Sequence, residues 1–206
     1  MRTEPGAITG ESSERDAIIE SAFACISEPH AGAVSVADIL ARTGLSTRAF
    51  YRHFASKDGL YVAMLRGAGD SLARRLDGIA ERDHGDPTAQ LRAWLGQLLC
   101  LLDDSRWATQ AVALDSDEVR AAKGYRAALE RWHTERERSL AVILRRGRDD
   151  GSFPQVKPEQ DAVAIGAVVT HVMSRMCSDG ECEVTHDEVV DFALRAVGAT
   201  ASARDR

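Results

Sequence analysis

The side chains best suited to chemistry in this chain lie on one short helical pattern. Thr47, Arg48 and Tyr51 fall on its outward side, while Phe50 and Phe54, one turn apart, fall on its inward side. A guanidinium group can donate two hydrogen bonds to the edge of a guanine, and hydroxyl groups can bind bases or phosphates. The spacing therefore predicts a helix that presents Thr47, Arg48 and Tyr51 to the major groove of double-stranded DNA.

The charges around this helix fit the same role. From Arg42 to Lys57 the chain has basic residues and no acidic one, although the whole chain carries a formal net charge of −6. A local basic face on an acidic protein suits contact with DNA at one site, because the acidic remainder repels DNA elsewhere. Nearby hydroxyl, imidazole and ammonium groups are candidates for phosphate contacts. The residues predicted to bind DNA are Ser35, Ser46, Thr47, Arg48, Tyr51, Arg52, His53 and Lys57.

Local signals define the helices that must hold these residues. Gly44 supplies a residue that tolerates a left-handed turn between two helices. Serine hydroxyls can satisfy the free amide groups at a helix start, and suitable serines occur at Ser35, Ser46 and Ser56. Together with a helix over about 14–28, these signals predict a three-helix helix-turn-helix unit over about 14–54.

The remainder of the chain also predicts helices. Apolar residues recur at helical spacing between loops that contain Gly or Pro, and no strand alternation occurs. The expected helices cover about 57–79, 87–102, 105–114, 118–150, 158–177 and 186–199. The predicted fold class is all-α, with a disordered tail over 1–13, a helix-turn-helix DNA-binding domain over 14–56, and a helical regulatory and dimerisation domain over 57–203.

The segment from Pro158 to Cys177 is apolar on nearly all sides. A helix without a polar face is buried on both sides. In a chain of 206 residues, one side can face the chain's own core and the other a second subunit. The predicted dimer interface comprises Ile165, Val169, Val172, Met173 and Phe192.

A metal-dependent enzyme is the alternative that the sequence raises. Glu130 with His133, and Glu183 with His186, have the spacing of the carboxylate–imidazole pairs of di-iron helical bundles. The first pair lies on a charged face and the second where a loop meets a helix, and no phosphate-binding loop or nucleophile elbow occurs. The sequence therefore predicts no enzyme, no cofactor and no metal site.

The compartment follows from hydropathy and cysteine usage. No apolar run reaches the roughly 18 residues that a spanning helix needs, and the N-terminal residues do not resemble a signal peptide. We therefore expect a cytoplasmic protein with no membrane partner. Its scattered cysteines fit reduced thiols, while the close spacing of Cys177 and Cys182 leaves a redox pair open.

Residues 43–61 resemble the recognition-helix signature of the tetracycline-repressor (TetR) family of bacterial regulators. The glycine, serine, Tyr-x-x-Phe and Ser-Lys-acid-x-Leu features of that signature stand here at Gly44, Ser46, Tyr51 with Phe54, and 56–60. The resemblance covers about 14–65. It implies a homodimer whose N-terminal units bind a palindromic operator, and C-terminal helices that hold a small-molecule pocket, with ligand binding releasing the DNA.

The pocket that this resemblance implies would draw on the tryptophans of the central helices. Aromatic residues make up only 5% of the chain, so three tryptophans there suggest ligand contacts. Ordinary core tryptophans are the alternative that stays open. The predicted lining is Trp94, Leu98, Trp107, Trp132 and His171.

The predicted function is that of a ligand-responsive DNA-binding transcriptional regulator, a repressor with an unidentified small-molecule effector. Two alternatives of other classes remain at this stage. One is a helical di-metal carboxylate enzyme, and the other is a dimeric helical scaffold that does not bind DNA.

Overall fold

The computed structural model describes residues 7–30, 32–81, 86–179 and 184–199. These residues form helices with no strand among them, so the fold is all-α, as predicted. The elements in chain order are α1 (Ala7–Ser27), α2 (Val36–Thr43), α3 (Thr47–His53), α4 (Lys57–Ala80), α5 (Pro87–Leu99), the 3-10 helix η1 (Cys100–Asp103), α6 (Ser105–Asp115), α7 (Asp117–Arg120), α8 (Tyr125–Asp149), α9 (Pro158–Asp179) and α10 (His186–Ala196).

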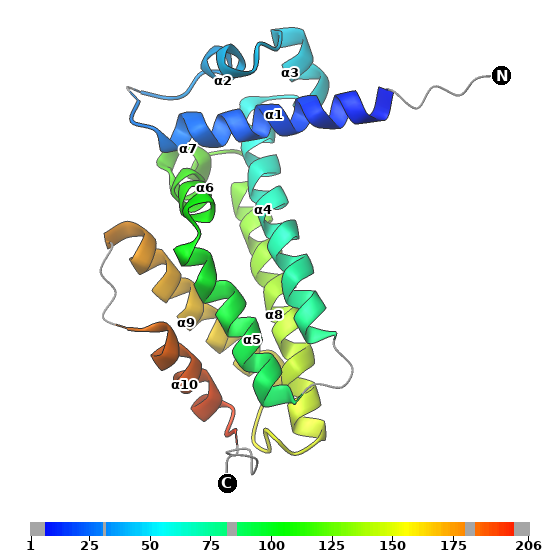
Figure 1. The fold of residues 1–206 in the computed structure, drawn as a ribbon, viewed down its shortest axis with the longest axis vertical. Coiled ribbons are helices and arrows are strands. Elements are labelled where there is room, and N and C mark those ends of the chain that lie inside the picture. Colours follow the sequence, from blue (N-terminus) through cyan, green and yellow to red (C-terminus); the bar gives the residue numbers. More distant parts are fainter. Residues whose placement is uncertain (1–6, 31, 82–85, 180–183, 200–206) are drawn as a thin grey trace, which may run out of the picture. The chain divides into compact units, whose positions relative to one another are not determined.

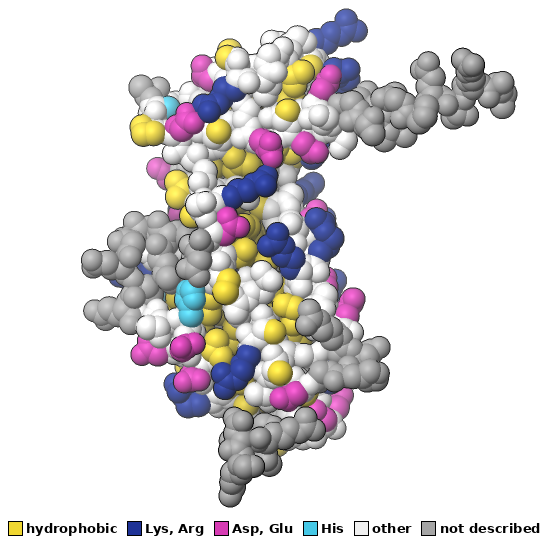
Figure 2. Space-filling model, in the orientation of Figure 1, with side chains coloured by type: hydrophobic (Ala, Val, Ile, Leu, Met, Phe, Trp, Pro, Cys, Tyr) yellow, Lys and Arg dark blue, Asp and Glu magenta, His cyan; other side chains and the backbone are white. Residues whose placement is uncertain are grey.

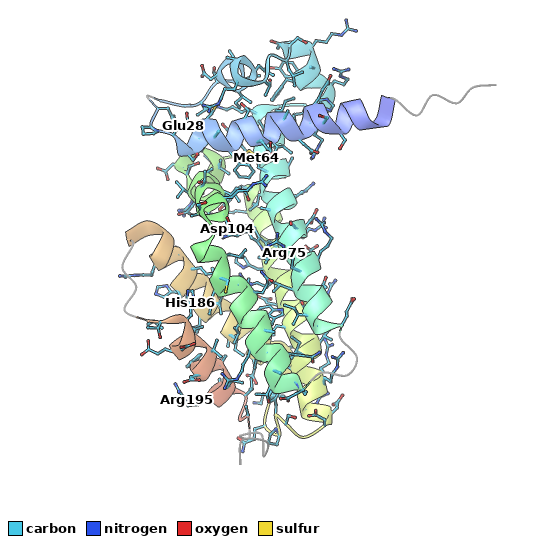
Figure 3. The ribbon with its side chains drawn as sticks, viewed as in Figure 1. Glu28, Met64, Arg75, Asp104, His186 and Arg195 are labelled. Carbon is cyan, nitrogen blue, oxygen red and sulfur yellow. The ribbon has the colours of Figure 1, made fainter. Side chains whose placement is uncertain are left out.

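Several helix starts follow the expected caps. The hydroxyl of Ser56 accepts a hydrogen bond from the amide of Gly59 at 3.1 Å, at the start of α4. Pro87 is the first residue of α5, where its missing N–H costs nothing, and Asp86 caps that helix. Asp104, labelled in Figure 3, accepts from the amide of Arg106 at 2.9 Å at the start of α6.

Two helix boundaries differ from the sequence-based expectation. α1 begins at Ala7, so residues 7–13 of the predicted tail are helical. Residues 1–6 of that tail lie outside the described part of the chain. Residues 118–150 form α7 and α8 instead of one helix, because Gly124 adopts a left-handed φ of 97° between them. Helical periodicity continues through that turn in sequence and therefore did not reveal it.

The helices group into two compact units. The first unit comprises Met1–Ala68 and Thr109–Leu129, and the second comprises Gly69–Ala108 and Glu130–Arg206. α4, α6 and α8 each have residues in both units. The domain boundaries given above stay a prediction.

The first unit has a small core beneath the helix-turn-helix. α2 and α3 lie on the same side of α1 (Figure 1). Ile18 of α1, Ile39 of α2 and Phe50 of α3 are fully buried, and Leu60 and Met64 of α4 are buried with them (Met64 is labelled in Figure 3). Burying apolar side chains from every helix of the unit fixes their mutual positions.

The second unit has a larger apolar core. Leu76, Leu95, Leu140 and Val169 are fully buried in one cluster to which α4, α5, α8, α9 and α10 all contribute. α10 packs against α5 and α9 (Figure 1). None of the described helices is both long and apolar enough to span a membrane.

The loop after α8 folds back onto that helix. Phe153 is fully buried, and its amide donates a hydrogen bond to the carbonyl of Gly147 at 2.8 Å.

On the face drawn in Figure 2, acidic and basic side chains are interspersed, with no large area of one sign among the described residues. Among the described residues, this face therefore has no broad charged surface that would mark an interface.

Candidate nucleic-acid interface

The turn between α2 and α3 is fixed by caps on both sides. Ser35 and Asp38 form a reciprocal capping box at the start of α2. Gly44 ends that helix with a left-handed φ of 68° and donates its amide to the carbonyl of Leu40 at 3.0 Å. Ser46 then caps α3 by accepting from the amide of Ala49 at 3.2 Å. These local contacts set the direction in which α3 leaves the turn.

The inward side of α3 locks it to the other helices of the unit. Phe50 is fully buried and Phe54 nearly so, and their ring centroids lie 5.6 Å apart. The guanidinium of Arg15, on α1, lies 5.5 Å from the centre of the Phe54 ring. The buried hydroxyl of Ser21 donates to the carbonyl of Ile39 at 2.7 Å, which ties α1 to α2. α3 is therefore held as a rigid element.

The outward side of α3 presents the predicted base-reading residues. Thr47 and Arg48 are exposed, and Tyr51 is 58% exposed although its ring edge meets Phe50. Within the described part of the chain, Arg48 makes no hydrogen bond or ion pair. Its guanidinium is thus available for a bidentate contact with a base edge.

Arg52 and His53 are engaged by an acidic residue of α1. A terminal nitrogen of Arg52 lies 2.9 Å from the carboxylate of Glu14, and Nε2 of His53 lies 3.1 Å from the same oxygen. The His53 side chain is only 9% exposed, whereas that of Arg52 is half exposed. The geometry assigns His53 to packing between α1 and α3, and leaves Arg52 able to exchange Glu14 for another anion.

Lys57 is engaged as well. Its ammonium donates to the carbonyl of Val34 at 2.9 Å and to the carboxylate of Glu118 at 2.6 Å. Glu118 also accepts from the hydroxyl of Tyr61 at 2.6 Å and from the amide of Val34 at 3.1 Å. Burial favours the neutral form of Glu118, yet these hydrogen bonds outweigh it and lower the pKa of Glu118. The sequence did not indicate Glu118, because no local pattern links it to its partners. Tyr61, Lys57 and Val34 precede it by 57, 61 and 84 positions.

The phosphate-binding role predicted for the two capping serines also meets competition. The hydroxyl of Ser35 donates to the carboxylate of Asp38 at 2.6 Å, and that of Ser46 accepts from Ala49. Both side chains are exposed, so their hydroxyl oxygens remain accessible, but the backbone amide of Ser35 is also engaged, because it donates to Asp38 at 2.9 Å. The phosphate contacts of Ser35, Ser46 and Lys57 stay predictions.

The N-terminal part of the chain matches a known family. The model for bacterial regulatory proteins of the tetR family matches residues 18–64, which run from α1 through α2 and α3 into α4. The chain belongs to the tetR family. As a tetR-family protein it is a DNA-binding transcriptional regulator and not an enzyme.

Solved structures share the fold of this tetR-family protein over nearly its whole length. The reduced form of NemR from E. coli has a TM-score of 0.70 at 19% identity, covering 92% of this chain and 98% of that one. The SmeT–triclosan complex has a TM-score of 0.77 at 22% identity, covering 89% and 91%. NalD of Pseudomonas aeruginosa has a TM-score of 0.68 at 19% identity, covering 95% and 100%. No curated protein matches the sequence closely enough to count as a relative.

The predicted pocket residues of this tetR-family protein do not form one lining. Trp94 and Leu98 are fully buried in the core, and the indole N–H of Trp94 donates to Ser139 at 3.3 Å. Trp107 and Trp132 instead meet edge to face, with ring centroids 6.1 Å apart. The indole N–H groups of both are buried and have no acceptor in the described residues. His171 lies in a groove between α8 and α9, apart from this pair.

Three of the predicted dimer residues face the wrong way for that role. Ile165, Val169 and Val172 are buried in the chain's own core, so they cannot form a surface. The middle of α9, residues 162–169, is apolar on all sides, so its period could not say which side faces inward. Met173 is partly buried against the core, and Phe192 is 43% exposed. Of the predicted set, Phe192 is the residue best placed to meet a partner.

The two Glu–His pairs with di-iron spacing do not form a metal site among the described residues. Nδ1 of His133 lies 3.1 Å from a guanidinium nitrogen of Arg136, which would repel a cation. Glu183 and Cys182 lie outside the described residues, and the side chain of Cys177 is not described either. Among the residues that the structure describes, no group of three His, Cys, Asp or Glu residues could hold a metal ion.

Proposed function

We propose that this tetR-family protein is a repressor that binds a palindromic operator as a homodimer and leaves it when a small molecule binds. One observation carries the DNA-binding part. α3 is fixed on its inward side, while Thr47, Arg48 and Tyr51 are exposed together on its outward side. A single short helix reads only a few base pairs, so a specific site requires a second copy.

The proposed dimer surface lies on α9 and α10. Phe192 is 43% exposed, Ala164 is exposed and Val168 is partly exposed, whereas Ile165 and Val169 face the core. Exposed apolar side chains of this kind mark association surfaces. A twofold axis would place the same residues on both sides of the interface. This surface replaces Ile165, Val169 and Val172 in the proposal.

The proposed effector site is the Trp107–Trp132 pair. Two buried N–H donors without acceptors are a cost that a ligand with acceptor atoms can remove. A Cβ atom on Gly69 of α4 would lie 3.3 Å from the Trp132 ring, so that ring rests on the α4 backbone. A ligand that displaces Trp132 would therefore release or press on α4, whose first residue is Lys57. We place the protein's action in the cytoplasm, with residues 14–56 as the DNA-binding domain and 57–203 as the regulatory and dimerisation domain.

Two of the similar proteins support the repressor and effector parts by analogy. NalD is described as the secondary repressor of the MexAB-OprM multidrug efflux pump, and SmeT was solved with triclosan. Both are less than 25% identical to this chain, so neither indicates which effector or operator applies here.

The test begins with selection of an operator from random double-stranded DNA, followed by a gel-shift titration. Arg48→Ala should weaken binding to the selected site about tenfold or more, since a bidentate base contact contributes roughly 1–3 kcal/mol. Arg75→Ala is the matched control, because Arg75 is an exposed arginine of α4 outside the interface (labelled in Figure 3). Footprinting should show two half-sites occupied by two protomers.

Three results would overturn parts of the proposal. Unchanged operator binding by Arg48→Ala would contradict the assignment of α3 as the DNA-reading helix and favour a scaffold that does not bind DNA. One protomer per operator would contradict the proposal of a homodimer. Operator binding that survives every compound in a broad panel of apolar metabolites would contradict the proposal of a small-molecule effector.

A further inference from the structure

A groove in the second unit runs between α8 and α9. Its volume is about 570 Å³, which falls in the range of small-molecule sites. α8 contributes His133, Arg136 and Glu137 to its lining. α9 contributes the apolar Val163 and Ala167 together with Gly166 and the polar Thr170, His171 and Ser174. The groove therefore combines a charged end with an apolar wall.

The charged end is an arginine that forms no ion pair among the described residues, although the charge of Glu137 in the same groove acts on it. Arg136 is only 6% exposed, and within the described residues it forms no ion pair. One terminal nitrogen donates to the hydroxyl of Thr170 at 2.6 Å and lies 3.3 Å from the carbonyl of Gly166. Its Nε is buried without an acceptor. Burial lowers the pKa of Arg136, but an arginine side chain keeps its charge in proteins.

A buried cation whose N–H donors lack acceptors is unfavourable unless another group accepts the missing hydrogen bonds. The planar guanidinium can bind a carboxylate through two parallel hydrogen bonds. His133 supports the same reading. Burial and the neighbouring Arg136 lower the pKa of His133, so the ring is neutral and its Nδ1 accepts from Arg136.

The apolar wall limits the rest of the ligand. Val163 is 51% exposed, although it lies beside the buried arginine. Ala167 and the bare backbone of Gly166 leave space along α9. Glu137 also lines the groove, so its charge offsets part of the attraction of Arg136 for one carboxylate and disfavours a ligand with a second anionic group.

We propose that this groove binds a small molecule with one carboxylate and an apolar body, the carboxylate on Arg136 and the body against Val163 and Ala167. The site is separate from the Trp107–Trp132 pair and does not depend on which residues contact DNA. Ala164, Val168 and Phe192, the proposed dimer surface, do not line it.

The experiment measures binding to the full chain by isothermal titration and thermal unfolding. The probes are benzoate and hexanoate, each compared with its neutral isostere, benzamide and hexanamide. The variants are Arg136→Met and, as the matched control, Arg138→Met, which removes an exposed arginine of the same helix. Arg136→Met should fold, because replacing a buried unpaired charge by an apolar side chain is often neutral or stabilising. Thr170 also keeps its own hydrogen bond to the Gly166 carbonyl at 2.8 Å.

We expect at least one carboxylate to bind the wild type and to raise its unfolding temperature, with its amide at least about tenfold weaker. Arg136→Met should lose that preference, and Arg138→Met should keep it. Equal binding of acid and amide, equal affinity in Arg136→Met, or no binding of either carboxylate overturns the proposal. If no carboxylate binds and Arg136→Met weakens self-association in sedimentation, the guanidinium serves a second copy of the chain and the small-molecule site is wrong.

Discussion

Lys57, the first residue of α4, donates a 2.6 Å hydrogen bond to Glu118 of α7. The same carboxylate accepts from Tyr61 and from the backbone of Val34. One side chain thus joins the loop before α2, the start of α4 and α7 within the first unit. Glu118 positions the helix-turn-helix without belonging to it.

Replacing Glu118 should loosen the first unit. We expect Glu118→Ala to lower the free energy of unfolding by about 2 kcal/mol, because three donors lose their acceptor. Glu118→Gln keeps an acceptor oxygen and should cost about half as much. Urea denaturation measures both, with Glu130→Ala as an exposed control expected to stay within about 0.5 kcal/mol of wild type. Equal stability of all three variants would contradict this role.

Glu118 should also make the protein sensitive to acid. Its pKa is lowered from 4.5 in the folded protein, so the ionised form stabilises the fold. That contribution is complete above the unfolded value and is lost as the pH falls through the folded pKa. The stability difference between wild type and Glu118→Gln should therefore shrink below about pH 4.5. Urea titrations at about pH 7 and pH 3.5 would show it, and a difference that does not change with pH would count against it.

Two glycines of the second unit should respond to alanine in opposite ways. A Cβ at Gly147 would collide with the buried Phe153 ring, whereas a Cβ at Gly78 would meet nothing within 4 Å. We expect Gly147→Ala to destabilise the protein by about 2–3 kcal/mol through overpacking. Gly78→Ala should stabilise it by about 0.5–1 kcal/mol, because alanine lowers the entropy of the unfolded chain. Thermal unfolding of both variants decides the point, and a shift in the same direction for both would refute it.

The tryptophans differ in what their N–H groups do. Trp94→Phe leaves the buried hydroxyl of Ser139 without its donor, so we expect a loss of about 2–3 kcal/mol. Trp132→Phe removes an N–H that has no acceptor, so the change should stay within about 1.5 kcal/mol. Chemical denaturation of the two variants tests this ranking. A larger loss for Trp132→Phe would mean that its N–H has a partner in solution, such as an ordered water.

Local chemistry made much of the helix-turn-helix formed by α2 and α3 predictable. The caps at Ser35 and Ser46 and the left-handed turn at Gly44 involve residues at most four positions apart, so the sequence shows them directly. The exposed side of α3 followed because Phe50 and Phe54 mark its inward side. Contacts between distant segments could not be predicted in this way.

Glu118 and Arg136 illustrate that limit. Both are charged residues on helices where solvent-facing charge is ordinary. Only the fold brings Lys57 to Glu118 and buries Arg136 without an ion pair among the described residues. α9 shows a second limit, because periodicity groups Ile165 with Val169 and Val172 but does not say that this side is the inner one. Gly124 shows a third, since its turn interrupts a helical pattern without interrupting the sequence pattern.

The ion pairs of the basic stretch from Arg42 to Lys57 determine how salt should affect DNA binding. Arg42 pairs with Glu28 (labelled in Figure 3), Arg52 with Glu14 and Lys57 with Glu118, which leaves Arg48 as the cation of this basic stretch that has no partner among the described residues. The counterions that binding releases are condensed on the DNA phosphates, and a protein cation whose charge a nearby carboxylate already balances displaces few of them. The slope of operator affinity against salt concentration should therefore report fewer phosphate contacts than the basic residues of this stretch suggest.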